Sequence, residues 1–181
     1  IVIIGAGGIV QGAHLPAYKK AGLPVAAITD IDQKKASELA SEFQIPKVYP
    51  SAEALLADKD IAVVDIAVPA SEQPALLSAA LEAGKHVLAQ KPLATSVGAA
   101  QDLAKKAEAS GLLVGVNQQL RFDEGMAAAH MMVEKGWVGE VSGLSITVNI
   151  DTPWHLWDWA QSMERLEIMI HSIHYHDAVR W

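Results

Sequence analysis

Short apolar segments alternate with helical ones in a regular order between residues 1 and 116. The segments that we expect to be strands are Ile1–Ile4, Val25–Thr29, a stub at Val48–Tyr49, Ile61–Ala67, His86–Ala89 and Leu112–Val116. The expected helices are Gly8–Ala21, Asp32–Phe43, Ala52–Ala57, Ser71–Ala83 and Ser96–Ala109. Strands joined through helices by short loops require right-handed crossovers. The sequence therefore predicts an α/β fold with a doubly wound parallel sheet.

The pattern changes after about Asn117. The elements expected there are a helix at Phe122–Lys135, a strand with one covered face at Val141–Ile150 and a helix at Leu166–Trp181. One strand and two helices do not close a domain. We therefore expect a complete domain at residues 1–116 and the beginning of a second, incomplete one at residues 117–181.

Composition excludes several classes of protein. The net charge of −7 argues against binding to a nucleic-acid backbone, which would require a basic patch. The apolar runs are far too short to span a bilayer, and with no cysteine the chain has neither disulfide nor thiolate chemistry. We expect a cytoplasmic protein with no membrane partner. Because Ile1 and Trp181 both fall inside expected elements, we also expect the full protein to extend in both directions.

A glycine turn, Gly5-Ala6-Gly7-Gly8-Ile9-Val10, follows the first expected strand and opens the first expected helix. Gly5 allows a tight turn, and Gly7 lets the backbone approach a pyrophosphate, whose charge the helix N-terminus favours. Val10 replaces the third glycine of the dinucleotide-binding fingerprint, so the match is partial. A plain strand-to-helix turn is the alternative.

Asp30 strengthens the dinucleotide interpretation. It ends the second expected strand, where a carboxylate can hydrogen-bond the adenosine ribose hydroxyls. It would also repel a 2′-phosphate, and no arginine follows nearby. The alternative is that Asp30 or Asp32 only caps the next helix. The turn and Asp30 together predict a Rossmann-type domain that binds NAD rather than NADP.

Lys91 directly follows the expected strand His86–Ala89, at the sheet edge where α/β proteins collect ligands. Its ammonium group could hydrogen-bond a substrate hydroxyl, stabilise a developing oxyanion or relay a proton. Pro92 is a candidate for a cis peptide bond. The alternative is an ordinary surface lysine in a loop.

Residues 83–94, AGKHVLAQKPLA, resemble the A-G-K-H-V-L-x-E-K-P-L-A signature of the Gfo/Idh/MocA family, which includes glucose–fructose oxidoreductase and inositol dehydrogenase. Further matches lie in the family's order at Gly5–Val10, His14–Ala17, Ile66–Pro69 and Val116–Phe122. The resemblance implies a Rossmann domain followed by an α/β domain with a large, open, mostly antiparallel sheet. In this family that sheet often joins a homo-oligomer, which here would be a dimer or tetramer.

The resemblance also implies roles for single residues. Lys91 would contact the nicotinamide ribose and the substrate, and Ala67 to Pro69 would pass beside the cofactor. Gln90 replaces the glutamate of E-K-P, which removes a charge, and Gln73 replaces a usual histidine. The expected cofactor-binding residues are Gly5, Gly7, Gly8, Ile9, Val10, Asp30, Ala67, Pro69, Gln73, Gln90 and Lys91.

Glu167, His171, His174 and Asp177 recur at spacings of three and four, so they would share one face of a helix. The family's H-x-x-D pattern falls on His174 and Asp177. This implies His174 as the general acid/base, with His171 in place of an aspartate that some members carry where Ile170 stands. The alternatives are a zinc site on His171, His174 and Asp177, and core histidines bonded to the backbone. Without an H-E-x-x-H pattern we predict no metal.

Aromatic residues precede this helix. They are Trp154, Trp157 and Trp159. Aromatic faces suit sugar rings, and packing or an oligomer contact is the alternative. Arg121 could bind a substrate oxygen or pair with Asp123 or Glu124. The expected substrate-binding residues are Arg121, Trp154 and Asp177.

These features predict an NAD-dependent oxidoreductase that acts on a CH–OH group of a small sugar, cyclitol or related polyol. Lys91 would polarise the carbinol and His174 would shuttle its proton. One alternative is a dinucleotide-binding sensor without turnover, which Gln90 and Ile170 keep open. Another is a non-redox enzyme that uses tightly bound NAD transiently in glycoside cleavage or lyase chemistry.

Overall fold

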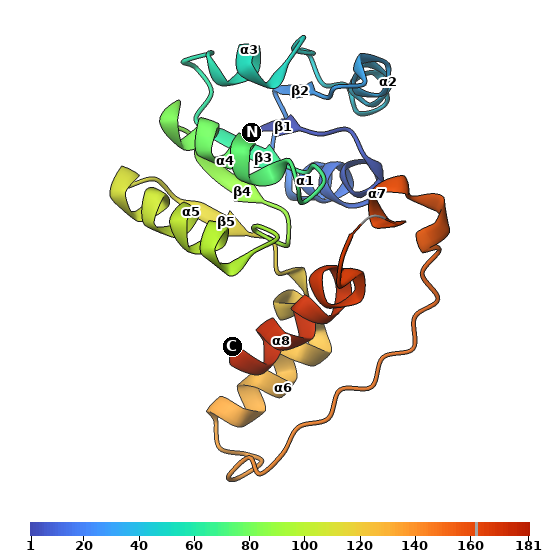
Figure 1. Ribbon diagram of the computed structural model, residues 1–181, viewed down its shortest axis with the longest axis vertical. Helices are drawn as coiled ribbons and strands as arrows, with labels where there is room; N and C mark the ends of the chain where they lie inside the picture. Colours follow the sequence, from blue (N-terminus) through green and yellow to red (C-terminus); the bar gives the residue numbers. More distant parts are fainter. Residues whose placement is uncertain (162) are drawn as a thin grey trace. The chain divides into compact units, whose positions relative to one another are not determined.

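The computed structural model describes residues 1–161 and 163–181, and the chain divides into two compact units, Ile1–Asn117 and Gln118–Trp181. The first unit contains a five-stranded sheet with the order β2-β1-β3-β4-β5 (Figure 1). Its strands are β1 (Val2–Ile4), β2 (Ala27–Thr29), β3 (Val63–Ile66), β4 (His86–Ala89) and β5 (Val114–Val116). All neighbouring strands are parallel, which confirms the predicted sheet.

The predicted stub at Val48–Tyr49 is not a strand of its own. Val48 forms only an isolated parallel bridge with Ile28 of β2. Pro46 and Pro50 flank the segment, and neither has the amide that a longer ladder would need. The bridge lies on the side of β2 away from β1. The sheet therefore keeps the strand order of a Rossmann fold, with its third strand reduced to a bridge.

Helices connect the strands of the first unit. They are η1 (Val10–His14, a π-helix), α1 (Leu15–Ala21), α2 (Gln33–Phe43), α3 (Ala52–Leu56), α4 (Gln73–Glu82) and α5 (Val97–Ser110). Ser51 and Ser96 begin α3 and α5, because each hydroxyl accepts a hydrogen bond from an amide three residues later, at 3.2 Å.

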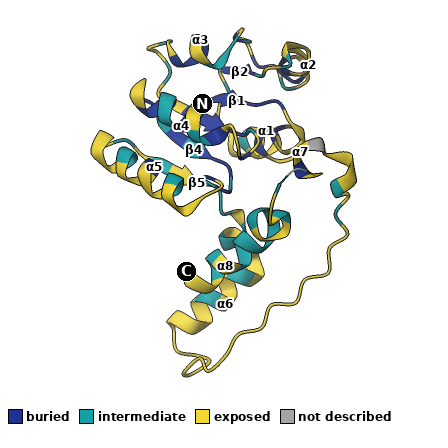
Figure 2. Ribbon diagram, in the orientation of Figure 1, coloured by how far each residue is buried: buried dark blue, intermediate teal, exposed yellow. Residues whose placement is uncertain are grey.

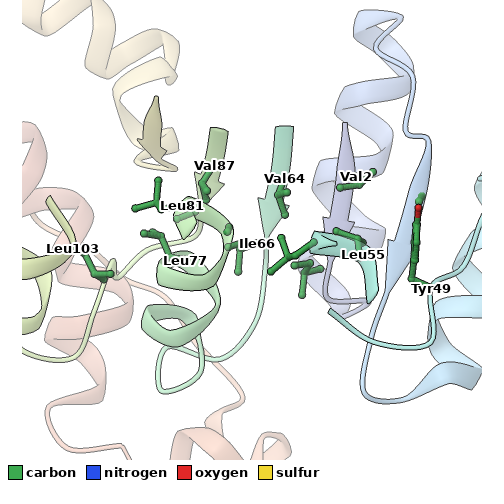
Figure 3. Close-up of a cluster of buried hydrophobic side chains, with 14 of the residues drawn as sticks. Val2, Tyr49, Leu55, Val64, Ile66, Leu77, Leu81, Val87 and Leu103 are labelled. Carbon is green, nitrogen blue, oxygen red and sulfur yellow. The ribbon is translucent and has the colours of Figure 1, made fainter. Parts of the chain in front are cut away.

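Alternate side chains of the strands enter two hydrophobic clusters, one on each face of the sheet. The cluster beneath α3, α4 and α5 includes Val2, Ile4, Leu55, Val64, Ile66, Leu77, Leu81, Val87 and Leu103 (Figure 3). The cluster beneath α1 and α2 includes Ile3, Val10, Leu15, Ile28, Ala36 and Leu39. Fully burying one such large side chain contributes about 1.5–3 kcal/mol. The two clusters therefore fix the strand ends that carry the candidate site.

The regular secondary-structure elements of the second unit, among the residues that the structure describes, are all helices. Its elements are η2 (Gln119–Phe122, a 3-10 helix), α6 (Glu124–Glu134), η3 (Trp154–Leu156), α7 (Asp158–Gln161), η4 (Ile168–Ser172, a π-helix) and α8 (Ile173–Arg180). Among residues 1–161 and 163–181, every helix falls short of the length and apolar character that a bilayer span requires.

The predicted strand Val141–Ile150 is wrong. This segment is extended but forms no ladder, and all of its residues are exposed (Figure 2). A strand needs a neighbour for its backbone amides and carbonyls. The described part of the second unit contains no other strand that could pair with it. The expected antiparallel sheet is accordingly not seen in these residues.

Candidate active site

The glycine turn lies at the carboxyl end of β1. Gly5 has a φ of 115°, in the range that favours glycine. A Cβ atom on Gly5 would overlap the carbonyl oxygen of Ala67, so the turn packs directly on the segment after β3. The strands β2 and β3 pair with opposite edges of β1, so the strand order reverses at β1. Open α/β sheets bind ligands at such a reversal.

Gly7 and Gly8 border open space. Both are exposed, a Cβ atom on either would meet nothing within 4 Å, and the neighbouring Ile9 is 49% exposed. Amides at the start of a helix have no partner within that helix and attract anions. Val10, which replaces the third glycine, is fully buried, and the helix takes the wider π form from Val10 to His14. The turn thus fits a pyrophosphate despite the missing glycine.

Asp30 folds back from the end of β2 onto this turn. Its Oδ2 accepts a hydrogen bond from the amide of Ala6 at 2.6 Å, and its Oδ1 accepts one from Asp32 at 2.8 Å. The cap of α2 is Asp32, whose carboxylate accepts from the amides of Lys34 and Lys35. The carboxylate of Asp30 therefore stands beside the glycine turn, at the position that suits a ribose hydroxyl.

Lys91 lies in the loop that follows β4, and its peptide bond to Pro92 is cis, as predicted. Burial lowers the pKa of the Lys91 ammonium group. Gln73, at the start of α4, is buried, and its Nε2 donates hydrogen bonds to the carbonyl oxygens of Gln90 at 2.5 Å and Pro92 at 2.8 Å. Gln73 therefore holds the main chain on both sides of Lys91.

The carboxyl end of β3 completes this side of the sheet. Ala67 is buried against the glycine turn, whereas Pro69 is exposed. The amide of Ala67 donates to the carbonyl oxygen of Ile4 at 2.8 Å, which extends the pairing of β1 and β3 by one residue. The first unit thus brings the glycine turn and Ala67–Pro69 to one edge of the sheet.

A buried polar network lies behind Gln90. Two of its members, His14 and Gln90, fall in motifs of the sequence, whereas Asp65 and Tyr18 do not. Asp65, in the middle of β3, is completely buried, and its Oδ2 lies 2.6 Å from Nδ1 of His14 and 2.7 Å from the hydroxyl of Tyr18. His14 Nε2 lies 2.6 Å from Nε2 of Gln90. The sequence signal for this network is a lone carboxylate inside a strand expected to be covered on both faces.

In the second unit, His174 lies on α8. Its Nδ1 is 2.9 Å from Oε1 of Gln118, and its Nε2 is 3.2 Å from Nε2 of Gln119. An amide oxygen only accepts, so Nδ1 carries a proton. When the ring carries this one proton, Nε2 is its basic nitrogen, as a general base requires.

The helical face predicted from Glu167 to Asp177 separates into independent pairs. The π-helix η4 ends just before α8, so residues on either side of that junction lose α-helical register. His171 Nδ1 lies 3.1 Å from Oε2 of Glu167. Asp177 accepts two hydrogen bonds from Arg121, both at 2.6 Å. The predicted alternative that Arg121 pairs with Asp123 or Glu124 is wrong, because its ion-pair partner is Asp177, and the carboxylate of Asp123 caps α6 instead.

Aromatic rings gather around His171. Trp154 is tilted against the His171 ring at 4.8 Å between centroids, and its edge meets Trp157 at 5.7 Å. Trp157 stacks with Trp159 at 6.0 Å. Within residues 1–161 and 163–181, no three His, Cys, Asp or Glu side chains are grouped so as to hold a metal ion.

Comparison with known proteins places these features in a family. The model of the GFO_IDH_MocA oxidoreductase family, NAD-binding Rossmann fold, matches residues 1–118. An inositol 2-dehydrogenase/D-chiro-inositol 3-dehydrogenase from Shouchella clausii is 34% identical over 142 residues, 76% of this chain and 41% of the relative. A D-xylose 1-dehydrogenase (NADP(+)) from Haloferax volcanii is 39% identical over 94 residues, 52% of this chain and 29% of the relative.

A solved NAD-binding protein from Listeria innocua has 28% sequence identity and a TM-score of 0.79, over 98% of this chain and 52% of that one. The chain thus spans about half, or less, of the length of the proteins that it matches. Both the ordered motifs and the arrangement of the first unit agree with the family model. The chain belongs to the Gfo/Idh/MocA family of oxidoreductases, with an NAD-binding Rossmann fold.

Proposed function

We propose that this chain is part of an NAD-dependent oxidoreductase that acts on a CH–OH group of a sugar, cyclitol or related polyol. The observation that carries the proposal is the placement of Lys91. It lies in a loop fixed by Gln73, after a strand of the same parallel sheet whose β1 end carries the glycine turn. A lysine at this position would lie at the same edge of the sheet as a bound dinucleotide and a substrate carbinol. The names of two matched relatives, an inositol and a xylose dehydrogenase, support this substrate class.

Asp30 supports NAD as the nucleotide. Its carboxylate is negatively charged and held beside the turn by the amide of Ala6. A 2′-phosphate on the ribose would meet this charge directly, whereas two hydroxyls could donate to it. Ile31, the next residue, is fully exposed and offers no positive charge.

Lys91 would bind the carbinol oxygen. In the oxidation direction the C–H bond breaks and its electron pair leaves as hydride, while the hydroxyl loses a proton. The nicotinamide, when bound, supplies the hydride acceptor. The ammonium of Lys91 would stabilise the negative charge that develops on the oxygen, and its lowered pKa makes it a better hydrogen-bond donor to that oxygen.

His174 would receive the proton of the hydroxyl on Nε2. The proton on Nδ1, held by Gln118, fixes the tautomer that this role needs. The family pattern supports bringing Lys91 and His174 to one substrate. His171, paired with Glu167, would relay the proton onward, and Trp154 beside it would contact the sugar ring. Arg121 and Asp177 are bound to each other and would act by holding α8 to η2.

The test is a panel of polyols, cyclitols and aldoses with NAD or NADP, applied to the full-length protein, with reduced nucleotide followed by absorbance. We expect turnover with NAD on at least one substrate, and its loss in Lys91→Ala and in His174→Ala. Nucleotide binding without turnover on any substrate would favour a sensor. Release of product without net reduced nucleotide would indicate transient redox chemistry, and equal affinity for NADP would refute the role of Asp30.

We also propose that the full-length protein is a homodimer or homotetramer joined through its second domain. The family resemblance supports this, as does the run of exposed apolar residues within Val141–Ile150. Light scattering on the full-length protein should give a mass of two or four subunits, and a monomer would contradict it.

A further inference from the structure

His14 is a buried histidine that the proposed chemistry does not use. It ends η1, its side chain faces the sheet, and it is only 7% exposed. Each of its ring nitrogens lies 2.6 Å from a polar atom, one on Asp65 of β3 and one on Gln90 after β4. A side chain bound at both ends in this way connects the middle of the sheet with the loop that carries Lys91.

The partners determine where the proton of His14 lies. Burial and the nearby Asp65 carboxylate raise the pKa of Tyr18 well above its usual range, so Tyr18 keeps its proton and donates to Asp65. Asp65 is therefore an acceptor, and Nδ1 of His14 must donate to it. At the other end, Nε2 of His14 faces the amide nitrogen of Gln90, which only donates. The ring is thus neutral, with its one proton on Nδ1.

We propose that His14 is a positioning residue for Lys91. His14 is held by the buried Asp65 and fixes the side chain of Gln90, and in this way it orients Lys91. This inference rests on the proposed function for Lys91. Gln73 already holds the main-chain carbonyl of Gln90. Because His14 also fixes its side chain, both the main chain and the side chain of Gln90 are held. The backbone direction at Lys91, the next residue, is therefore fixed as well.

The network also explains how this chain accommodates glutamine in place of the family's glutamate. Asp65 contributes one negative charge, and the neutral His14 and Gln90 add none. An ionised glutamate at position 90 would offer only acceptors to Nε2, so the ring would need a second proton. Among the residues that the structure describes, the ionisable groups in contact with His14 are Asp65 and Tyr18, and Lys91 follows Gln90. The net charge behind Lys91 is therefore the same with either residue, and only the protonation of His14 changes.

Nuclear magnetic resonance of the full-length protein, labelled with 15N in histidine, tests the protonation of His14 without any need for turnover. At neutral pH we expect a single neutral form with the proton on Nδ1. Gln90→Glu should convert His14 to the doubly protonated form, whereas Gln101→Glu, an exposed position on α5, should not. A doubly protonated ring in the unmodified protein, or a neutral one in Gln90→Glu, overturns the inference.

Two substitutions of His14 separate positioning from simple packing. The glutamine side chain places an amide where Nε2 stands, so His14→Gln retains a partner for Gln90. The asparagine amide lies where Nδ1 stands, so His14→Asn retains only the partner for Asp65. We expect kcat to fall on the order of tenfold in His14→Asn and less in His14→Gln, with nucleotide affinity within about twofold in both. The reverse order of kcat would show that His14 serves only to satisfy Asp65.

The 13Cε signal of Lys91, assigned with Lys91→Arg, supplies a readout that does not depend on the reaction. Its titration should shift in His14→Asn and remain close to that of the unmodified protein in His14→Gln. If neither variant moves this signal, the link between His14 and Lys91 is refuted, whatever substrate the enzyme uses. If the signal moves as expected while no substrate is turned over, the proposed function fails and the link between these residues stands.

Discussion

The two units hold their polar side chains in different ways. In the first, Asp65, Gln73 and His14 are at most 7% exposed. Asp65 of β3 binds His14 and Tyr18 on the helices η1 and α1, and Gln73 and His14 bind Gln90 after β4. In the second, Arg121 pairs with Asp177 and His171 with Glu167, and these four side chains remain 19–58% exposed. The first unit thus holds its polar side chains in a connected buried network, whereas the second holds them in separate, partly exposed ion pairs.

This difference determines how much each contact should be worth. A buried group that loses its partner keeps its full desolvation cost, about 1–3 kcal/mol. An exposed ion pair is replaced by water and typically contributes about 0–1 kcal/mol. Removing a buried polar partner in the first unit should therefore be costly, and removing an exposed ion-pair partner in the second should be mild.

The largest effect on stability is expected at Gly5. Gly5→Ala places a Cβ atom on the carbonyl oxygen of Ala67 and forces alanine to a φ of 115°. We expect the free energy of unfolding to fall by more than about 3 kcal/mol, measured by urea denaturation of the full-length protein.

Gly7→Ala is the matched control for Gly5→Ala, since the added methyl group meets nothing within 4 Å. We expect its stability to change by less than about 0.5 kcal/mol. Its nucleotide affinity should fall, because the methyl group occupies the space that a pyrophosphate would approach. Equal destabilisation by the two substitutions would contradict the different roles of the two glycines.

Local features of the first unit could be predicted from the sequence, whereas contacts between distant segments could not. The glycine turn, the cis bond at Pro92 and the position of Lys91 after β4 follow from short motifs. His14 binds Asp65, which is 51 residues away, and Gln90, which is 76 residues away. Those contacts depend on which strands become neighbours, and no short motif encodes that order.

In the second unit, local periodicity predicted elements that the structure does not contain. Alternation at Val141–Ile150 is typical of a strand, but a strand forms only with a neighbour to pair with. Helical spacing put Glu167 and Asp177 on one face with the histidines, but η4 inserts a π turn into that helix. A periodic pattern therefore fixes a structure only where the surrounding chain supplies the partner or keeps the register.

Lys85 should give the next largest loss of stability. Its ammonium group is buried and donates to the carbonyl oxygens of Asp58 at 2.7 Å and Ile61 at 2.8 Å, which holds the loop before β3. Lys85→Met leaves both carbonyls without this partner and should cost about 2 kcal/mol in urea denaturation. Lys105→Met, at an exposed position on α5, is the control and should cost less than about 0.5 kcal/mol. Similar values for the two would show that the buried lysine is dispensable.

Lys91 is expected to make stability depend on pH at alkaline values. Burial lowers the pKa of its ammonium group, so the folded chain loses this proton at a lower pH than the unfolded chain. Between the two pKa values the unfolded state binds more protons, and the free energy of unfolding therefore rises with pH. Lys91→Met should remove this rise and Lys105→Met should keep it, in urea denaturation at a series of pH values. A rise of the same size in Lys91→Met would assign it to another group.

The smallest change is expected for the pair of Arg121 and Asp177. Its geometry is bidentate, with two hydrogen bonds of 2.6 Å, but the two side chains are 36% and 19% exposed. Water can replace each partner, and the apolar stem of a long side chain can keep its packing. Arg121→Met should therefore change the free energy of unfolding by less than about 1 kcal/mol, and Asp177→Asn should do the same. A loss of more than about 2 kcal/mol in both variants would mean that the pair is energetically buried in the full-length protein. In that case only the pair of His171 and Glu167 would still show the contrast between the two units. The pair of Arg121 and Asp177 would then contribute as much to stability as the buried polar contacts of the first unit.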